Sequence, residues 1–590
     1  MIDREWALPM FEEFDYEIKG LRSLTWQARH LDRFLASELS RDDWVEAAKF
    51  VQERVTDEVI ETAVRNMPPE TYEISGKEIE AKLKERIKDL ATYAEEYYEL
   101  LAREVDVVGS NDDEYFEVLR NEDGSVAVVV YNIADKGSKE RGNKLLYRRT
   151  FYPKETKEVR LFGLGGEDVF FVEGESKKSI KVRIVGGRGD DTYEDTSRVR
   201  ASAKKTRIYE KDVNENIDVG KEAKLVSSVN ESAYDYDRTA FKYNTYLPLL
   251  WVLYNSSNKL VFAGALQFTT QRYGKEDYST KHFIGAGLAT GGSKVVGYDG
   301  NFHHVLGKWD VTLRGGVAYP AYVVEFYGLG NDTVKEDDLL DDDYYRFNFN
   351  SFQVSTGLVR EFWKVSSFGV ELNYEYNSET EPVNTGSNIL ETDDFIGEEQ
   401  TSFADAKVTL DLDLRDSERL PERGWRLFLS HDNGVITNKD YSNFGKTLGY
   451  ISWFSTARIV TPTTLGLRVG GGHSYGDIPF YRQFSLGGDT YLRGFRKNRF
   501  TGDDMLFLNS DLRFKILGPP YKRWPIDLGL KAFFDSGKII EDEFNFNDLH
   551  YGYGFGFYLF TYDERTTINF TFGFSDEESW QLQFALGAVF

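Results

Sequence analysis

Apolar and polar residues alternate with two different periods along the chain. In the first part, apolar residues recur at helical spacing, most clearly in one stripe over residues 79–101. Ser40 with Asp43 and Ser75 with Glu78 have the spacing of capping boxes, in which a serine side chain closes the first turn of a helix. This part of the chain therefore predicts helices, and their charged outer faces suit water.

Between residues 111 and 210 the period changes to that of strands. Short apolar runs, such as 126–131 and 180–185, are separated by turn residues. They predict a small β-sandwich or a curled sheet. Residues 211–235 are charged and polar, which predicts a linker.

From about residue 240 to the end, strands and turns alternate. In the segment 568–574, isoleucine and phenylalanine alternate with small and polar residues. This alternation is typical of a strand that separates lipid from the lumen of a barrel. Counting such segments predicts sixteen strands, and the acidic inserts at 328–343 and 378–400 predict extracellular loops.

The chain thus divides into three predicted parts. These are a helical region (1–110), a β-rich domain with a linker (111–235) and a barrel (236–590). The predicted fold class is mainly β: a sixteen-stranded antiparallel transmembrane β-barrel with an N-terminal helical and β-rich region, which we expect in the periplasm.

The amino-acid composition supports the predicted barrel and disfavours one class of binding partner. The chain has 43 Phe, 36 Tyr and 52 Gly but only 13 Pro, a mixture that suits many strands with aromatic girdles. A formal net charge of -26 disfavours nucleic acid as a partner, because its phosphates would be repelled. The absence of cysteine excludes disulfides and thiolate chemistry. The first residues do not have the pattern of a signal peptide, so we expect a fragment or a misassigned start.

One decapeptide near the C-terminus combines arginine, glycine and apolar residues in an unusual way. Leu492, Arg493, Gly494 and Phe495 follow a Leu-Gly-Gly sequence that begins at Leu486. An arginine among apolar residues needs a carboxylate partner if it is withdrawn from water. The segment resembles the loop motif of the Omp85 superfamily of outer-membrane barrels, in which the loop folds back into the lumen.

The resemblance implies partners for Arg493. In the family, the arginine pairs with an acid on a strand that reads Phe-x-Asp-x-Gly, and Asp535 matches this position. Asp511 lies where the family tends to carry Glu. Asp413 to Asp416, followed by proline and glycine, resembles the mid-barrel hairpin of the family. The residues alone leave two roles open for this pairing: it gates the lumen, or it only fixes the loop.

The last strand resembles the C-terminal assembly signal of outer-membrane barrels. It ends on an aromatic residue, Phe590, and carries Phe584 and Leu586 on the face expected to contact lipid. The alternative is that these residues only close the barrel.

Two glycine-aspartate turns in the β-rich domain suggest a metal. Residues 186–193 fit a calcium-binding repeat, and residues 163–170 fit it in part. Asp168, Asp190 and Asp191 are the candidate calcium ligands, with plain turns as the favoured alternative. Because the two turns are 23 residues apart rather than nine, we expect no continuous roll. No other cofactor is expected.

Catalytic motifs are not found. The seven histidines are scattered, and His303 and His304 should point to opposite faces of one strand and so be unable to chelate one metal easily. There is no metalloprotease, phosphate-loop or nucleophile-elbow motif.

The function implied by the resemblance is non-enzymatic insertion or translocation of proteins, or of lipid, at the outer membrane of a Gram-negative bacterium. Outer-membrane lipid, client proteins and other envelope subunits are the expected partners. The POTRA module usual in this family is not recognised before the barrel, and the N-terminal region looks like the connecting part of fusions between a metallophosphatase and an Omp85-type barrel. The alternatives are therefore an anchor for a periplasmic, phosphatase-like module encoded upstream, or an accessory subunit of a larger complex.

Overall fold

The computed structural model contains two compact units, which are described separately. Unit 1 comprises Met1–Thr245 with Gln271–Tyr278, and unit 2 comprises Tyr246–Thr270 with Ser279–Phe590. The structure describes residues 14–586 except Lys136, 201–204, 212–215, 256–258, Glu276, 321–322, 336–341, Lys364, 384–386, 439–442, 459–460, 518–525, 542–546 and 562–565.

Unit 1 begins with helices whose first turns are closed by side chains. The predicted capping box of Ser40 and Asp43 is confirmed at the start of α3, and Thr56 caps α4. None of the described helices has the length and apolar character needed to cross a bilayer. The helical elements before the first strand are α1 (Leu21–Leu24), α2 (Arg29–Leu35), α3 (Arg41–Arg54), α4 (Asp57–Arg65), α5 (Pro69–Thr71), the π-helical η3 (Tyr72–Gly76), α6 (Lys77–Lys88) and α7 (Leu90–Ala102).

The predicted capping box of Ser75 and Glu78 is wrong. Ser75 lies inside η3, and its hydroxyl donates to the carbonyl oxygen of Thr71 at 3.1 Å. A serine within a helix commonly bonds back to the carbonyl four residues earlier, so this hydroxyl does not cap α6. The apolar stripe of residues 79–101 is also divided, because the helix breaks at Asp89 between α6 and α7.

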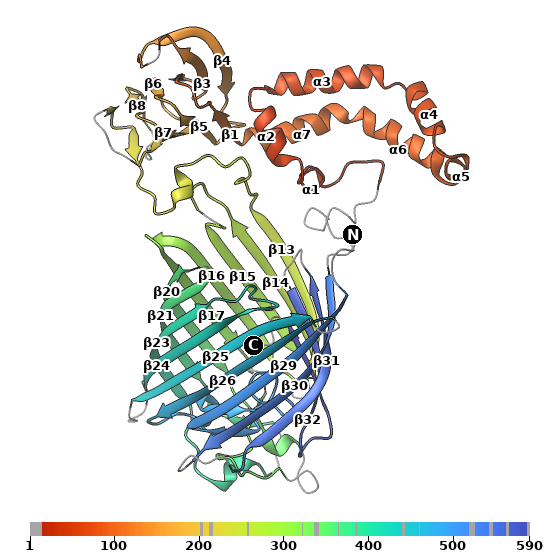
Figure 1. The fold of residues 1–590 in the computed structure, drawn as a ribbon, viewed down its shortest axis with the longest axis vertical. Helices are drawn as coiled ribbons and strands as arrows, with labels where there is room; N and C mark the ends of the chain where they lie inside the picture. Colours follow the sequence, from red (N-terminus) through yellow and green to blue (C-terminus); the bar gives the residue numbers. More distant parts are fainter. Residues whose placement is uncertain are drawn as a thin grey trace. The chain divides into compact units, whose positions relative to one another are not determined.

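Two facing sheets, wound from successive coils of the chain, form the rest of unit 1 (Figure 1). One sheet has the order β1-β5-β7-β10-β12 and the other β11-β8-β6-β2-β3-β4, with β9 beside β6. All pairs are parallel except those of β3 with β2 and β4. The strands are β1 (Glu104–Val108), β2 (Glu114–Arg120), β3 (Val126–Ile133), β4 (Arg141–Phe151), β5 (Glu158–Gly165), β6 (Val169–Ser176), β7 (Lys181–Arg188), β8 (Thr192–Asp195), β9 (Arg198–Val199), β10 (Thr206–Tyr209), β11 (Ile217–Val219) and β12 (Ala223–Leu225).

The expectation that the two glycine-aspartate turns cannot belong to a continuous roll is wrong. Leu164 pairs with Gly187 and Gly165 with Arg188, so the turns lie on neighbouring coils. Each coil contains a strand in both sheets, and 23 residues are therefore the length of one coil. The repeat is longer than nine residues because a strand pair, rather than one short strand, separates equivalent turns.

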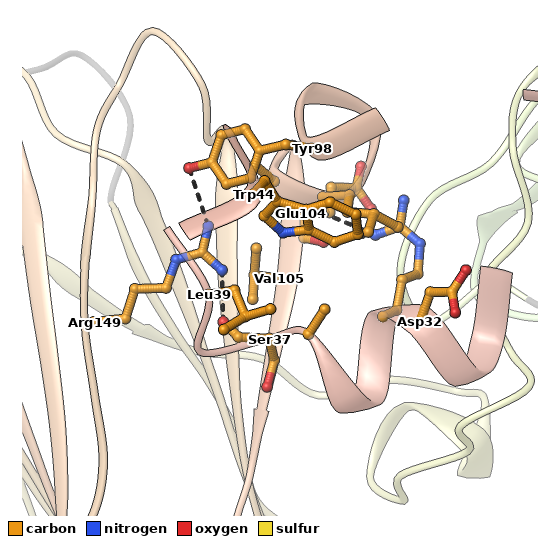
Figure 2. A pocket seen from close by; sticks show the side chains of 12 residues that line it. Asp32, Ser37, Leu39, Trp44, Tyr98, Glu104, Val105 and Arg149 are labelled. Carbon is orange, nitrogen blue, oxygen red and sulfur yellow. Dashed lines mark hydrogen bonds between the residues drawn. The ribbon is translucent and has the colours of Figure 1, made fainter. Parts of the chain in front are cut away.

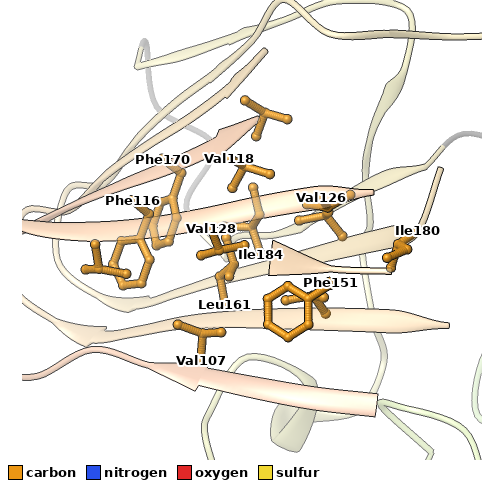
Figure 3. Packing of buried hydrophobic residues seen from close by; sticks show 14 of the residues in the cluster. Val107, Phe116, Val118, Val126, Val128, Phe151, Leu161, Phe170, Ile180 and Ile184 are labelled. Atoms are coloured by element: carbon orange, nitrogen blue, oxygen red, sulfur yellow. The ribbon is translucent and has the colours of Figure 1, made fainter. Parts of the chain in front are cut away.

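The core of unit 1 lies between its two sheets (Figure 3). Phe116 stacks on Phe170 with ring centroids 4.6 Å apart, and Phe170 stacks on Tyr193 at 5.4 Å. These aromatic residues occupy equivalent positions on three successive coils, because Phe116 is paired with Phe170 and Phe170 with Tyr193. The stack ties the coils together through buried apolar surface.

Unit 2 is a sixteen-stranded antiparallel sheet that curls into a barrel (Figure 1), which confirms the predicted strand number. Every described pair in this sheet joins strands that are consecutive in its order. The strands are β13 (Thr245–Asn255), β14 (Lys259–Thr270), β15 (Thr280–Ala289), β16 (Lys294–Leu306), β17 (Trp309–Ala318), β20 (Ser351–Phe362), β21 (Ser366–Asn377), β23 (Thr401–Asp413), β24 (Gly424–Ile436), β25 (Phe444–Arg458), β26 (Pro462–Tyr475), β29 (Asp504–Leu517), β30 (Ile526–Ile540), β31 (His550–Thr561), β32 (Thr566–Phe574) and β33 (Gln581–Leu586).

Alternate residues of the barrel strands face opposite environments. On β26, Leu467 and Val469 are exposed to 36% and 47%, whereas Arg468 between them is 6% exposed. Apolar side chains thus cover the outside and polar side chains face the lumen, as expected for a barrel in lipid.

The connections differ between the two ends of the barrel. Because neighbouring strands run in opposite directions, alternate connections meet at one end. One end, here called the long-loop end, carries small sheets formed by β18 (Val324–Glu325), β19 (Arg346–Asn348) and β22 (Glu381–Pro382), and by β27 (Phe484–Leu486) and β28 (Phe500–Gly502). Both predicted long inserts are at this end. The other end, the short-turn end, includes the two-residue turn between β16 and β17.

The aromatic stack in unit 1 leads to the first prediction. Phe170→Ala should lower the free energy of unfolding of unit 1 by about 3–5 kcal/mol, because a fully buried ring is removed from between two others. Pulse proteolysis of the full chain in detergent, across a urea series, measures this loss. Phe171→Ala, on the opposite and partly exposed face of β6, is the matched control. Equal losses for both variants would contradict the role of the stack.

Candidate functional site

A hairpin from the long-loop end carries the predicted motif. Its strands β27 and β28 pair Phe484 with Gly502 and Leu486 with Phe500. The intervening segment holds Leu492 and Phe495, both of which are buried. Together with lumen-facing residues of β29 and β30, the hairpin forms a separate apolar core: Phe484, Leu486, Leu492, Phe495, Phe500, Met505, Phe507 and Ile539.

Arg493 is bound to the inner wall of the barrel by two aspartates. Its Nε and one terminal nitrogen donate to Asp535 Oδ2 and Oδ1, each at 2.7 Å, and the other terminal nitrogen donates to Asp511 Oδ1 at 2.7 Å. The backbone N–H of Arg493 also donates to Asp535 Oδ2 at 2.9 Å. The structure therefore brings together the three residues that the sequence singled out, with Asp535 on β30 and Asp511 on β29.

This cluster is fully withdrawn from solvent. Arg493, Asp511 and Asp535 are 3%, 2% and 0% exposed. One guanidinium and two carboxylates leave an excess negative charge, and the inward-facing Lys531 and Arg513 lie within electrostatic reach of Asp511. A buried, fully bonded group of this kind fixes geometry strongly, since removal of one partner leaves another charge uncompensated.

Glycines allow the hairpin backbone to lie against the wall. A Cβ atom on Gly552 would be 1.7 Å from the carbonyl oxygen of Arg493, and one on Gly494 would be 2.4 Å from that of Phe574. Gly494 also has φ of 97°, a conformation that favours glycine. Gly552 on β31 thus makes room for the loop. Gly573 on β32, not singled out from the sequence, also contacts Gly494, with a Cβ distance of 2.8 Å.

Further residues that hold the motif were missed from the sequence. Asn509 donates to the carbonyl oxygen of Tyr491 at 2.8 Å and accepts from Arg468, which also donates to the carbonyl oxygen of Thr490. The guanidinium of Arg493 lies over the ring of Phe533, 4.1 Å from its centroid. The alternation of β26 and β29 places these side chains in the lumen, but nothing in the local sequence indicates their partners.

A second arginine ties the hairpin to the loops of the same end. Arg499, 1% exposed, donates from two nitrogens to the carboxylate of Glu577 and from two to Thr333. Asn331, two residues before Thr333 in the same loop, accepts from the backbone N–H of Ile539 on β30 at 3.0 Å. The loop around residues 329–335 therefore covers the hairpin and the rim of the barrel.

The connection between β23 and β24 folds across the short-turn end. Its Arg419 accepts at the carbonyl oxygen from Thr567 on β32, at 2.8 Å, and Pro421 accepts from Arg513 on β29. Arg415 and Asp413 form a buried ion pair at 2.6 Å at its base. The segment that resembles the mid-barrel hairpin thus reaches strands on another part of the wall.

The predicted C-terminal signal is described in part. Phe584 pairs with Phe570 and Leu586 with Ile568 in the β32–β33 ladder. Phe590 lies outside the described residues. A recognition role for these residues stays a prediction.

In unit 1, buried acids stack at the turns between the two sheets. Asp168 Oδ1 accepts from the backbone N–H of Glu114 at 2.8 Å, and Asp191 Oδ1 accepts from that of Asp168 at 2.9 Å. Each acid follows a glycine by five residues, and a Cβ on Gly163 or Gly186 would lie about 2 Å from the second carboxylate oxygen. Gly109 and Glu114 repeat the spacing on the preceding coil, a third copy that was not predicted from the sequence. We call Glu114, Asp168 and Asp191 the acid ladder.

The acid ladder lacks compensating cations among its described hydrogen-bond partners. Burial raises the pKa of Asp168 to about 9 and that of Asp191 to about 6. Tyr193 donates to Asp191 Oδ2 at 3.4 Å, whereas Asp168 Oδ2 has no hydrogen-bond partner among the described residues. Asp190 is exposed, so it does not join the ladder. Calcium binding by Asp168, Asp190 and Asp191 stays a prediction.

A small cavity lies where the helices of unit 1 meet its sheets (Figure 2). Its volume is about 10 Å³, which is about the space of one water molecule. Arg149 donates to Tyr98 and to the carbonyl oxygen of Ser37, and Arg33 donates to the carbonyl oxygens of Leu100, Leu101 and Glu104. These arginines donate hydrogen bonds to carbonyl groups that follow α2 and lie around the end of α7. The cavity therefore belongs to the contact between the helices and the sheets.

The fold and the lumenal site define a class of protein: an outer-membrane barrel with an internal hairpin anchored to its wall. Residues 306–590 match the family described as the Omp85 superfamily domain. The match begins at the end of β16, whereas the predicted barrel begins at residue 236. Strands β13 to β16 continue the same sheet outside the matched range.

Solved structures with a similar fold include BamA from Haemophilus ducreyi lacking POTRA domains 1-3, at 12% identity and a TM-score of 0.43, over 58% of this chain and 69% of that chain. CdiB from Escherichia coli is similar at 12% identity and a TM-score of 0.40, over 58% of this chain and 62% of that chain. The match thus spans less than two thirds of the CdiB chain. None of the curated protein sequences matches this chain.

The ion cluster gives a direct prediction for hairpin docking. Arg493→Ala should weaken docking by about 3–5 kcal/mol, because two buried carboxylates lose their cation. Asp535→Asn should weaken it less, because Asp511 remains. Hydrogen exchange of residues 487–499 in the full chain measures docking, with Lys497→Ala, an exposed position of the same loop, as the control. Unchanged protection in both site variants would refute the anchoring role.

The acid ladder predicts how the stability of unit 1 depends on pH. An acid whose pKa is raised on folding adds to the free energy of unfolding. This added stability is fully present below the unfolded pKa of about 4 and is lost as pH rises through the folded pKa. Unit 1 should therefore lose stability between about pH 4 and pH 9, the upper limit being the folded pKa of Asp168. Asp168→Asn, which keeps an uncharged acceptor for Glu114, should flatten this slope. Denaturant titrations of both proteins at several pH values measure it, and equal slopes would contradict the assignment.

Proposed function

We propose that this chain acts in the insertion or translocation of proteins, or of lipid, at the outer membrane of a Gram-negative bacterium. The activity is non-enzymatic, and the partners are membrane lipid and client proteins. In this proposal the short-turn end and unit 1 face the periplasm, and the long loops face outwards. The predicted parts 1–110, 111–235 and 236–590 serve as helical region, β-rich domain and barrel.

The single observation that carries this proposal is the binding of the Arg493 hairpin inside an Omp85-type barrel. The hairpin has its own apolar core and is joined to β29 and β30 by a buried ion cluster. A segment that only closed a pore would not need such defined contacts with two neighbouring strands. Fixing these two strands keeps this C-terminal part of the wall in one shape.

Segments of the chain lie over both ends of the barrel. Arg499 and Asn331 hold the loop of residues 329–335 on the hairpin, and the 414–423 segment reaches β32 at the other end. Passage along the lumen would require release of these contacts. We therefore favour an opening between β13 and β33, the first and last strands in the order of the sheet, with the docked hairpin as a rigid support.

An anchoring role is the second candidate. The described α-helices of unit 1, α1 to α7, precede its strands, and the strands form two wound sheets. This arrangement differs from a repeated module of strands around a helix pair, and it favours a unit that presents or contacts another envelope component, such as a phosphatase-like module or the subunits of a larger complex.

A complementation experiment separates the two candidates. In a strain depleted of this protein, wild-type and Lys497→Ala should restore outer-membrane protein levels, whereas Arg493→Ala should not. Arg493→Lys should restore them only in part, because lysine cannot make the bidentate contact. Membrane proteomics measures the outcome, with the amount of folded barrel as a check. Full restoration by Arg493→Ala would favour the anchor.

A further inference from the structure

Two histidines and an aspartate converge at the hairpin between β16 and β17. One ligand atom from each of His303, His304 and Asp310 lies within 4.8 Å of the others. His303 and Asp310 are buried, at 7% and 4% exposure, and His304 is partly buried. This group belongs to unit 2 and is separate from the Arg493 cluster.

The backbone brings the two histidines to one side, so the expectation that they point to opposite faces of a strand is wrong. The pairing of β16 with β17 shifts register between Phe302 and Leu306, and His304 has φ of 49°. A bulge of this kind re-aims a side chain that a regular strand would direct to the other face. The two imidazole rings stack as a result, with centroids 3.8 Å apart and planes at 24°.

Asp310 fixes this conformation from the opposite strand. Its Oδ1 accepts from the backbone N–H of His304 at 2.8 Å, and its Oδ2 lies 2.9 Å from His303 Nδ1. The backbone N–H of His303 donates to the carbonyl oxygen of Ser279 at 2.9 Å. The left-handed conformation of His304 is unfavourable for a residue with a Cβ, and these contacts hold it in place.

We propose that His303, His304 and Asp310 form a binding site for a divalent transition metal ion of the Zn²⁺ class. Two imidazoles and one carboxylate are a common ligand set for such ions, and solvent completes the coordination. In a tetrahedral site with bonds of 2.0–2.1 Å, ligand atoms are about 3.3 Å apart. His303 Nδ1 and Asp310 Oδ2 are already near this distance, and rotation of the imidazoles can bring in the third donor. Ca²⁺ and Mg²⁺ prefer oxygen ligands and should not compete.

Metal binding here is an exchange of ions without redox chemistry. The metal replaces the proton that His303 and Asp310 share, and this proton passes to solvent. The bound ion would join the end of β16 to the start of β17 and stabilise the bulge between them.

The chain provides a matched control in its second histidine-aspartate pair within the barrel. His473 Nδ1 lies 2.6 Å from Asp504 Oδ1, and no second histidine is grouped with this pair among the described residues. If a hydrogen-bonded histidine-aspartate pair were sufficient for metal binding, both places would bind alike. The difference between them isolates the contribution of His304.

Calorimetric titration of the tag-free full chain in detergent tests the proposal, with Zn²⁺, Ni²⁺ and Mg²⁺ as separate probes. His304→Asn removes the imidazole and tolerates the left-handed conformation, Asp310→Asn keeps the acceptor for the backbone of His304, and His473→Asn is the control. Circular dichroism and heat-modified migration on gels verify that each variant forms the barrel.

We expect about one Zn²⁺ per chain, a raised melting temperature that a chelator reverses, and no effect of Mg²⁺. His304→Asn and Asp310→Asn should weaken binding at least about tenfold, and His473→Asn should not. Absence of stoichiometric binding to the folded wild-type chain would overturn the proposal. Equal affinity of His304→Asn and wild type would also overturn it.

Discussion

The barrel depends most on one buried interaction, the guanidinium of Arg493 between the carboxylates of Asp511 and Asp535. Withdrawing three charged groups from water is costly, and the cost is offset only when the hydrogen bonds are nearly complete. The surrounding chain meets this condition. Glycines on β31 and β32 let the hairpin backbone approach, and Asn509 with Arg468 satisfies the carbonyl groups beside the motif. The local architecture of the lumen follows from the requirements of this cluster.

Unit 1 also buries carboxylates, but their partners differ from those in the barrel. Its acid ladder also combines buried carboxylates with glycines that make close approach possible, but the described partners are backbone amides and hydroxyls rather than guanidinium groups. Its acids therefore favour the neutral form, whereas the carboxylates of Asp511 and Asp535 are bound by the guanidinium of Arg493. The ladder and the aromatic stack occupy equivalent positions on successive coils, so one structural repeat supplies both the polar and the apolar contacts that join them.

The Omp85 superfamily domain and the anchored hairpin support a role in membrane insertion or translocation, and they also limit how such a role could be carried out. The hairpin is bound to the inner wall of the barrel, the 329–335 loop is bound to the hairpin, and the 414–423 segment contacts β32 at the short-turn end. The proposed function therefore places movement at the boundary between β13 and β33 and not along the axis of the barrel. The convergence of His303, His304 and Asp310 adds a local constraint at the short-turn end that is independent of the hairpin.

The sequence by itself determined the fold class, the sixteen strands and the identity of Arg493 and its two acidic partners. These features depend on the local alternation of apolar and polar residues and on a motif with known spacing, and both can be recognised in the sequence alone. Only the tertiary structure decided which groups meet across distant strands: Arg499 with Thr333, Thr567 with Arg419, and Asn509 with Arg468. It also decided that Ser75 lies within a helix, that 23-residue coils stack and that His303 and His304 share a side. Each of these outcomes depends on register, on bulges or on partners far along the chain, which local periodicity does not encode.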